Sequence, residues 1–410
     1  MEIIVQKFGG TSLQSRKTRQ HVLFHIREAI QMQFKVIVVV SALGKSPEPY
    51  ATDSLLDLVD YPQTNASERE LDLLLSCGEI ISAVVVANEL KAIGIKATAF
   101  TGAQAGILTT DKHMNAKIKA VNPKRLLDAF QMYDVVVVAG FQGVTENGDV
   151  TTIGRGGSDT TATALAVTTE ALRAEIYTDV DGIMTADPKL VETARVLENC
   201  TYTETCNLAY QGAKVIHPQA VEIAMQAKLP IHIRSTFKRS QGTLIFADEE
   251  KDSEYKLNAK PITGIAHTAG IAQVKIARKT NRHYSMTEIF KTLAANGISI
   301  DFINITPNEI AFTMPNEILP FAKNLFEKLH IQSEINECCA KVAAVGAGMN
   351  GLPGVAAKVV SALAKKDVQI LQAADSNTTI WVLVPEEKLK IALNALHDTF
   401  KLSETIPLGI

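Results

Sequence analysis

Short apolar runs rich in β-branched residues alternate with helical stretches along the first 246 residues. The runs predict strands, of which the clearest span residues 3–6, 36–40, 134–139 and 175–178. Between them, Val22, Ile26 and Ile30 recur at helical spacing, and further helices are predicted over 71–93 and 159–173. Continuous apolar strands separated by helices are typical of a largely parallel sheet covered by helices on both faces. The pattern predicts an α/β domain over residues 1–246 that binds ligands beyond the carboxyl ends of its strands.

A different organisation begins after residue 246. Residues 247–261 are rich in charged and polar side chains and predict a linker. Beyond it, the pattern of residues 262–335 recurs in 336–410 with an offset of 70, as Phe312 and Val382 illustrate. Each copy reads as a βαββαβ unit of about 70 residues. Because one such unit has only a small core, we expect the two copies to pair.

Charge and composition exclude several classes of protein. Lys plus Arg number 41 and Asp plus Glu 44, so the net charge of −3 offers no basic excess for nucleic acid. The apolar run 36–40 is far shorter than the ~20 residues of a transmembrane helix, and residues 1–7 lack the pattern of a secretory signal. The five cysteines, odd in number and without zinc-type spacing, predict reduced, buried thiols. We expect a soluble cytoplasmic protein with no nucleic-acid or membrane partner.

The first chemical motif, Lys7-Phe8-Gly9-Gly10-Thr11-Ser12, follows a predicted strand and precedes a helix. Paired glycines let the backbone approach a phosphate, and the N–H groups of the helix start face it. Lys7 adds a cation that neutralises charge on a transferring phosphoryl group. A plain capped turn is the alternative, because the spacing matches neither the Walker loop nor the dinucleotide fingerprint.

A second glycine-rich motif, Gly154-Arg155-Gly156-Gly157-Ser158-Asp159, lies at the start of another predicted helix. Its glycines form a nest for an anion. Arg155 suits a carboxylate, which it can bind through two parallel hydrogen bonds. Asp159 is alternatively only a negative charge at the helix start.

Acidic residues mark two further places. The segments Thr178-Asp179-Val180-Asp181-Gly182 and Thr185-Ala186-Asp187-Pro188-Lys189 form a strand-end loop crowded with carboxylates. At a phosphate site such carboxylates serve Mg²⁺ or a ribose hydroxyl, and a solvated turn is the alternative. Glu79 interrupts an otherwise apolar helix, where an unpaired carboxylate is costly. It therefore indicates a cationic partner, such as the ammonium group of an amino-acid substrate.

Together with Ser41-Ala42 and Gly140-Phe141-Gln142-Gly143, these motifs resemble those of aspartate kinases of the amino-acid-kinase superfamily, in the same order and over essentially the whole chain. The paired C-terminal units resemble the tandem ACT regulatory domains of that family. The segment 297–307 is most similar to the diaminopimelate-sensitive aspartate kinases of spore-forming bacteria. The resemblance implies ATP-dependent phosphorylation of L-aspartate to 4-phospho-L-aspartate, the entry step to lysine, threonine, methionine and diaminopimelate.

The resemblance also implies roles for particular residues. Those that contact ATP would be Lys7, Phe8, Gly9, Gly10, Thr178, Asp179, Met184, Thr185, Asp187, Lys189 and Lys214. Those that bind aspartate would be Ser41, Thr52, Glu79, Arg155, Gly156, Gly157 and Ser158, with Arg155 on the α-carboxylate and Glu79 on the α-ammonium. Lys7 and Asp159 would be the catalytic residues. The attacking side-chain carboxylate, with a pKa of ~4, is already ionised and needs no general base. Lys7, the glycine N–H groups and the Mg²⁺ of ATP neutralise charge, and no metal ligand of the protein is assigned.

An effector site is expected in the first ACT-like unit. Ser285, Met286 and Thr287 open its first helix, whose N–H groups suit a carboxylate, and Asp301 suits an ammonium. The corresponding expectations are feedback inhibition by a pathway end product, first meso-diaminopimelate and then lysine, and homo-oligomerisation through the ACT-like units. The alternative is that this half only dimerises the enzyme.

Three other functions compete with this prediction. The first is an NAD-dependent oxidoreductase, because the run Gly346-Ala347-Gly348-Met349-Asn350-Gly351 matches a dinucleotide fingerprint. The 59 residues after this run are too few for the two-half dinucleotide fold, which argues against that function. Another amino-acid kinase, acting on glutamate, acetylglutamate or a nucleotide, is the nearest rival, although such relatives generally lack tandem ACT units. A non-catalytic amino-acid sensor would leave Lys7 and Arg155 unexplained.

Overall fold

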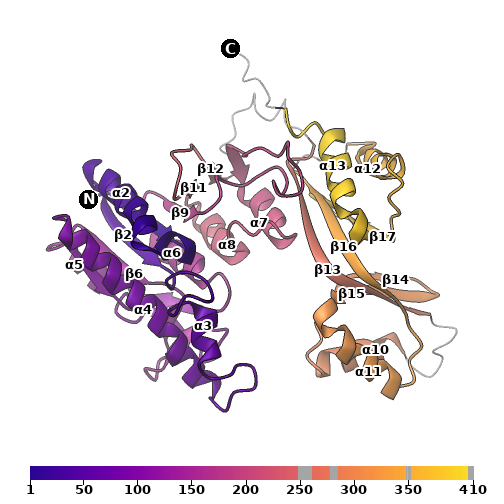
Figure 1. Cartoon of the computed structure of the whole chain (residues 1–410), viewed down its shortest axis with the longest axis horizontal. Coiled ribbons are helices and arrows are strands. Elements are labelled where there is room, and N and C mark those ends of the chain that lie inside the picture. The colour runs from indigo at the N-terminus through magenta and orange to yellow at the C-terminus, as the bar shows by residue number, and fades with distance from the viewer. Residues whose placement is uncertain (248–260, 278–284, 348, 350–351, 405–410) are drawn as a thin grey trace. The chain divides into compact units, whose positions relative to one another are not determined.

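The computed structural model describes residues 1–247, 261–277, 285–347, 349 and 352–404, and the chain divides into two compact units (Figure 1). Unit 1 comprises Met1–Ile183, Val196–Tyr210 and Lys214–Lys256, and unit 2 comprises Met184–Arg195, Gln211–Ala213 and Leu257–Ile410, each as far as it is described. The predicted linker at 247–261 lies almost entirely outside the described residues.

Unit 1 is built on an eight-stranded sheet of order β10-β12-β11-β9-β1-β2-β6-β3. Its strands are β1 (Ile3–Phe8), β2 (Lys35–Val40), β3 (Ala97–Phe100), β6 (Val135–Ala139), β9 (Ala174–Thr178), β10 (Asn199–Thr201), β11 (Ile231–Ser235) and β12 (Thr243–Phe246). Neighbouring strands are parallel except for the antiparallel pair β11–β12. The predicted largely parallel sheet is therefore confirmed, and its strands of continuous Val and Ile are buried on both faces.

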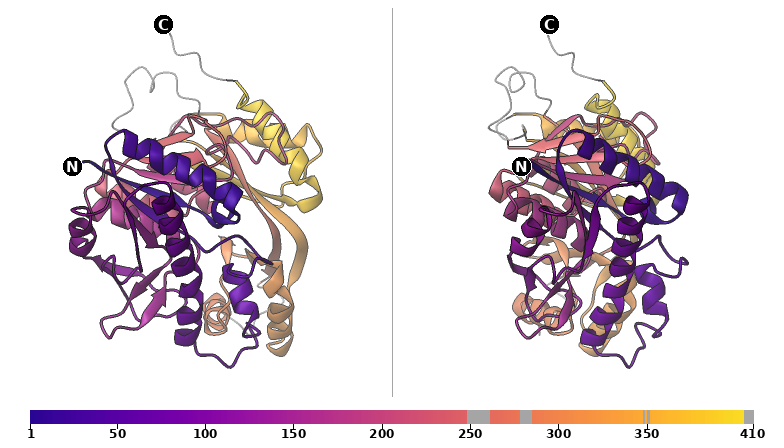
Figure 2. Two further views of the ribbon diagram at one scale, coloured as in Figure 1. Left: turned by 60° about the vertical axis from the view of Figure 1, so that its left-hand side comes forward. Right: turned by 90° about the vertical axis from the view of Figure 1, so that its left-hand side faces the viewer.

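Helices cover both faces of this sheet (Figure 2). On one face, α2 (Arg16–Gln31) and α4 (Glu68–Ala92) share an apolar cluster with alternate residues of β1, β2 and β6. α6 (Gly157–Thr168) contacts β1, β2 and β9 outside that cluster, so it lies on the other face. α6 ends earlier than residue 173 because Glu170 adopts a left-handed φ of 51° and the Ala171 N–H turns back to the Ala166 carbonyl at 2.9 Å.

A second, smaller sheet belongs to unit 1 and was not anticipated from the hydrophobic pattern. Its order is β5-β4-β7-β8, with strands β4 (Ile107–Thr109), β5 (Ile118–Val121), β7 (Gln142–Val144) and β8 (Val150–Thr152). Strands of three or four residues leave too short an alternation to read. The remaining helices of unit 1 are α1 (Gly10–Leu13), α3 (Thr52–Asp57), α5 (Lys124–Ala129), α7 (Tyr202–Tyr210) and α8 (Pro218–Ala227).

Unit 2 contains the predicted repeat. The first copy comprises β13 (Gly264–Ala277), α10 (Met286–Ala295), β14 (Asp301–Ile305), β15 (Glu309–Pro315), η2 (Asn316–Ile318) and α11 (Leu319–Lys328). The second comprises β16 (Glu334–Val345), α12 (Val355–Ala364), β17 (Gln372–Asp375), β18 (Thr379–Pro385), η3 (Glu386–Lys388) and α13 (Leu389–Thr399). Strand starts such as Glu309 and Thr379 keep the predicted offset of 70.

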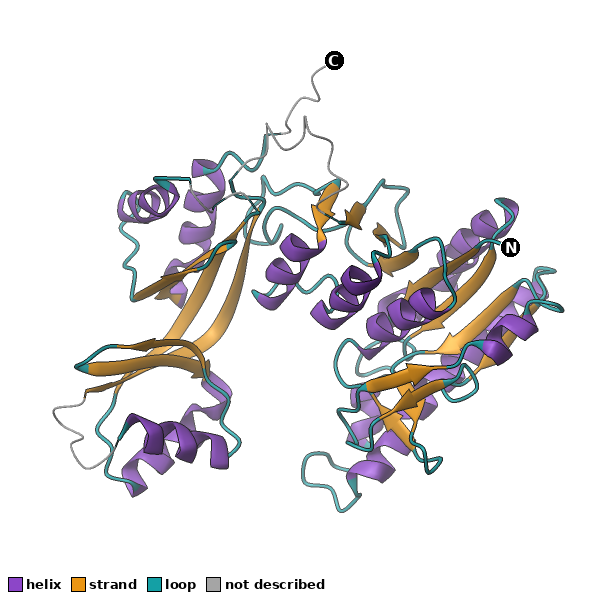
Figure 3. Cartoon of the chain, turned by 180° about the vertical axis from the view of Figure 1, so that it is seen from behind, coloured by secondary structure: helices purple, strands orange, loops and turns teal. Residues whose placement is uncertain are grey.

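The two copies pair, as the small core of each one required. Their strands form one sheet of order β14-β15-β13-β16-β18-β17, in which β13 and β16 are antiparallel neighbours (Figure 3). After α11 the chain enters β16, so the closing strand expected for the first copy is the opening strand of the second.

One segment expected in the first domain packs into unit 2 instead. In Met184–Arg195, the side chains of Ala186 and Val191 join the apolar cluster of α12 and α13. The buried Thr185 hydroxyl lies 3.0 Å from Nε2 of His397. Apolar side chains and a shared hydrogen bond therefore place this segment with the second repeat.

Two expectations about the surface can be compared with the described residues. Among them, no helix is long and apolar enough to cross a membrane. Cys77 and Cys338 are exposed, so the expectation of buried thiols is wrong for these two. Cys77 faces outward because its neighbours Ser76 and Gly78 take the buried positions of α4.

Candidate active site

The glycine turn after β1 brings two strand ends together. Gly10 begins α1, and a Cβ at this position would collide with the carbonyl oxygen of Gly44 in the loop after β2. The Gly44 N–H in turn donates to the Gly10 carbonyl at 3.0 Å. Only glycine permits this approach. The turn therefore places Lys7 and the N–H groups of the α1 start at the carboxyl edge of β1 and β2.

Lys7 is held by a nearly buried carboxylate. Its Nζ lies 2.6 Å from Oδ1 of Asp159, and the two side chains are only 14% and 10% exposed. The other oxygen of Asp159 accepts a hydrogen bond from the backbone N–H of His217 at 3.2 Å. Asp159 is thus more than a charge at the start of α6, because it fixes the ammonium of Lys7.

The start of α6 depends on a second glycine. Gly156 has a φ of 70°, and a Cβ there would overlap the His217 ring. Two residues later, Oγ of Ser158 accepts from the Ser41 hydroxyl at 3.0 Å. The structure therefore joins the predicted aspartate-binding residues Ser41 and Ser158, which lie 117 positions apart.

Glu79 is a buried carboxyl with one oxygen unpartnered. It is 2% exposed in α4, and Oε1 accepts from the Ala42 N–H at 3.1 Å. Oε2 accepts no hydrogen bond within the described part of the chain. Burial raises the pKa of Glu79 to about 8, against the smaller lowering effect of the hydrogen bonds. Such a group suits an incoming ammonium, which would restore the charged form.

The other predicted aspartate ligands lie at or just before the starts of α3 and α6. Arg155 is exposed, and within the described residues its guanidinium makes no ion pair or hydrogen bond. Thr52 opens α3, in the segment that follows Ala42. Gly157 is the first residue of α6. The structure gives no direct contact that joins Arg155 or Thr52 to Glu79.

The predicted nucleotide residues fall into two groups. Thr178 ends β9, beside β1, and Asp179 follows it; the Thr178 carbonyl accepts from the Thr236 N–H at 2.8 Å. Lys214 is exposed in unit 1, and Phe8 is core, with its ring stacked on Tyr177 at 4.7 Å. These residues share unit 1 with Lys7, Gly9 and Gly10.

The second group, Met184, Thr185, Asp187 and Lys189, belongs to unit 2. The Thr185 hydroxyl is buried against His397, and Oδ1 of Asp187 accepts from the Lys189 backbone N–H at 2.9 Å. Asp187 therefore stabilises a local turn, which is the alternative interpretation of this loop given above.

The predicted effector residues lie in the first repeat of unit 2. The Ser285 side chain caps α10 by accepting from the Glu288 N–H, and Thr287 is exposed in the first turn. Oδ2 of Asp301 lies 2.5 Å from Nζ of Lys341 on β16. Partial burial raises the pKa of Asp301, but the hydrogen bond and charge of Lys341 outweigh it and lower that pKa overall.

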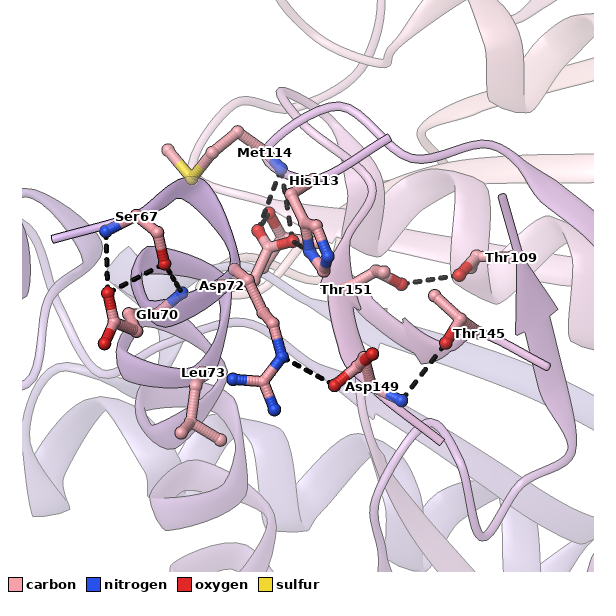
Figure 4. A network of polar contacts seen from close by, with 12 residues as sticks. Ser67, Glu70, Asp72, Leu73, Thr109, His113, Met114, Thr145, Asp149 and Thr151 are labelled. Atoms are coloured by element: carbon pink, nitrogen blue, oxygen red, sulfur yellow. Dashed lines mark hydrogen bonds and ion pairs between the residues drawn. The ribbon is translucent and has the colours of Figure 1, made fainter. Parts of the chain in front are cut away.

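A buried network beside this site was missed by sequence reasoning. Asp72, on α4, is fully buried and accepts hydrogen bonds from His113 and Met114 (Figure 4). It also accepts one from the Thr152 hydroxyl. The available signal was the one that singled out Glu79: an acidic residue on the buried face of an apolar helix, here seven positions earlier.

The comparisons with known proteins fit this geometry. Residues 2–235 match the amino acid kinase family, and residues 334–398 match the ACT domain. Aspartokinase 1 of Bacillus subtilis is 54% identical, and the alignment covers 98% of this chain and all of that protein. An aspartokinase of Geobacillus stearothermophilus is 40% identical, with 98% of each chain covered.

Solved structures share the fold. An aspartate kinase of Clostridium acetobutylicum superposes with a TM-score of 0.77 at 25% identity, over 97% of this chain and all of that one. Escherichia coli aspartokinase III, in complex with aspartate and ADP, superposes with a TM-score of 0.78 at 24% identity, over 97% of this chain and 99% of that one. At 24% identity, the similarity to the Escherichia coli structure is evidence for the fold alone.

Proposed function

The chain belongs to the amino acid kinase family and, within it, to the aspartokinases, and we infer from this that it transfers the γ-phosphoryl group of ATP to the side-chain carboxylate of L-aspartate. The product is the mixed anhydride 4-phospho-L-aspartate. The observation that carries the residue assignment is Glu79, a buried carboxyl with one free oxygen close to the strand ends that hold Lys7.

We assign the recognition of the amino acid to opposite charges. Ionised Glu79 would bind the α-ammonium, and the free guanidinium of Arg155 would bind the α-carboxylate. Ser41 and Ser158, already hydrogen-bonded to each other, and Thr52 would offer hydroxyl groups to the remaining oxygens. Gly156 and Gly157 complete the assigned pocket at the start of α6, where the peptide N–H of Gly157 already donates to the Gly154 carbonyl at 3.0 Å.

The phosphoryl transfer itself needs positioning and charge neutralisation. The attacking carboxylate is ionised at neutral pH, so no base is assigned. Lys7 would neutralise the charge that develops on the transferring group, and Asp159 would hold its ammonium in place through their 2.6 Å ion pair. The N–H groups beside Gly9 and Gly10 would bind the phosphate oxygens.

The nucleotide is proposed to lie along the ends of β1 and β9, against Thr178, Asp179 and Lys214 and above the buried Phe8. Mg²⁺ bound with ATP supplies further charge neutralisation. Phosphate oxygens and the carboxylates Asp159 and Asp179 are oxygen donors of the kind that this ion prefers.

Regulation is proposed to reside in unit 2. An amino-acid end product, meso-diaminopimelate or lysine, would bind near Ser285, Met286, Thr287 and Asp301 and inhibit the kinase. Homo-oligomerisation through the ACT-like repeats and a cytoplasmic location complete the proposal, which rests on the family and on the paired repeats.

The decisive test is a panel of acceptors. Purified enzyme with ATP and Mg²⁺ is given L-aspartate, L-glutamate, N-acetyl-L-glutamate or UMP, and ADP release is followed by a coupled assay. Hydroxylamine traps an acyl phosphate as a hydroxamate, which identifies the acceptor group. We expect hydroxamate with aspartate only, and none with the Lys7→Ala variant. Preference for another acceptor would contradict the proposal.

A further inference from the structure

Asp72 is a buried, hydrogen-bonded side chain near the site to which no role has yet been assigned. Asp72 is 0% exposed, and its two oxygens face three donors from outside its own helix. Oδ2 lies 2.7 Å from Nδ1 of His113, Oδ1 accepts from the Thr152 hydroxyl at 2.5 Å, and both oxygens lie within 3.2 Å of the Met114 N–H. The close view shows His113 and the Met114 N–H directed at the Asp72 carboxylate (Figure 4).

The donors come from two segments that frame the glycine-rich motif of Arg155. His113 and Met114 lie in the loop between β4 and β5, and Met114 adopts a left-handed φ of 59° there. Two residues later, the Ala116 N–H donates to the Thr152 carbonyl at 2.9 Å. A carboxylate that accepts from all three groups thus fixes the loop and the end of β8 as one piece.

The same loop also lies against Gly154. A Cβ on Gly154 would be 3.1 Å from Oδ1 of Asn115, which is tighter than ordinary van der Waals contact, so the loop packs closely against this glycine. Thr152 and Gly154 are the third and first residues before Arg155. The position of the Arg155 backbone is therefore set from the Asp72 network.

Asp72 and Glu79 share α4 and are separated by seven residues, or two helical turns. A further tie between helix and hairpin lies between them, where the Gln142 side-chain N–H donates to the Ser76 carbonyl at 2.9 Å. Gln142 is the cross-strand partner of Thr152. The helix that carries Glu79 is therefore joined at two buried points, one on each strand, to the β7–β8 hairpin that leads to Arg155.

We propose that Asp72 is a positioning residue that sets the distance between Glu79 and Arg155, and so the fit of the aspartate backbone. This inference rests on the proposed function. The α-ammonium and α-carboxylate of an amino acid share one carbon atom, so the two protein groups that bind them tolerate little relative movement. A misplacement of about 1 Å can cost about a hundredfold in rate, and a buried carboxylate with three donors is the kind of support that prevents it.

The variant Asp72→Asn tests this with little change of volume. Its amide keeps one acceptor oxygen and turns an N–H₂ group toward donors that now lack an acceptor. We expect the KM for aspartate to rise at least about tenfold while the KM for ATP stays within about twofold. The matched control is Asp149→Asn, which neutralises the exposed carboxylate that accepts from Arg69 at 2.6 Å in the β7–β8 turn, and should change neither constant.

A second variant covers the case in which Asp72→Asn does not fold. Thr152→Val removes a single O–H donor at constant shape, so we expect a several-fold rise in the KM for aspartate alone. If the wild type phosphorylates aspartate and the folded variants keep its KM, or raise both KM values equally, the positioning role is wrong and the proposed function stands. If the wild type forms no acyl phosphate from aspartate, both are wrong.

Discussion

The pH dependence of aspartate recognition tests the assignment of Glu79 directly. Burial raises the pKa of this carboxyl from 4.5 to about 8, so the substrate-free enzyme holds it mostly protonated at neutral pH. Only the ionised form attracts an ammonium. At pH 6 about 1% of Glu79 is ionised and at pH 8 about half, so kcat/KM for aspartate should rise about 50-fold between them.

The variant Glu79→Gln should abolish that rise. At pH 8 the loss of a charge-assisted partner in a buried site costs about 3 kcal/mol, or about 150-fold in kcat/KM for aspartate. At pH 6, where the wild type is itself mostly protonated, the two enzymes should differ only several-fold. The assay is ADP release at limiting aspartate and saturating Mg-ATP, from pH 6 to 8.

The internal control is the pH dependence of kcat/KM for ATP at saturating aspartate. Phosphate groups ionise near pH 6, and this ionisation would change the profile for ATP and the profile for aspartate alike. A flat aspartate profile in the wild type, or a rise that survives in Glu79→Gln, would refute the assignment.

The same carboxyl links stability to pH. Since its pKa is higher in the folded than in the unfolded chain, the folded state binds the extra proton between these values. The stability that this proton contributes to the folded state is fully present below pH 4.5 and is lost as the pH rises through about 8. The rise of the pKa from 4.5 to about 8 corresponds to about 5 kcal/mol of unfolding free energy. Glu79→Gln should therefore melt higher than the wild type at pH 9 without aspartate, and aspartate should raise the melting temperature of the wild type alone.

Three further predictions concern the other charged groups. Lys7→Ala should lower kcat by at least about a hundredfold with nearly unchanged aspartate binding, measured by calorimetry, because its charge matters most in the transition state; a near-normal kcat would contradict its role. Arg155→Ala should raise the KM for aspartate by about 30-fold, a loss of about 2 kcal/mol, and that for ATP little; a change confined to ATP would mean that the two pockets are exchanged. Asp301→Ala should relieve inhibition by meso-diaminopimelate or lysine with an unchanged kcat in the absence of inhibitor, and a variant that stays fully inhibitable would remove Asp301 from the effector site.

The sequence alone determined the features that depend on local chemistry and periodicity. Continuous Val and Ile runs predicted parallel strands such as β2 and β6, because a strand buried on both faces has no polar side. An offset of 70 predicted the repeat, and the small core of each copy predicted that β13 and β16 would pair. The glycines at 10 and 156 marked turns that no other residue can make so closely.

Only the tertiary structure decided which distant residues meet. Nothing in the spacing of Ser41 and Ser158 shows that their hydroxyls lie 3.0 Å apart, nor that Asp159 holds Lys7. The segment 184–195 carries the same kind of loop sequence as 178–182, yet its buried Ala186 and Val191 pack it into unit 2. Asp72 shares the pattern of Glu79, but its donors come from one short strand and a loop with no readable periodicity. Such contacts arise from the order of strands in the sheets and the packing of α4 against them, and long-range packing leaves no trace in the local pattern of a single sequence.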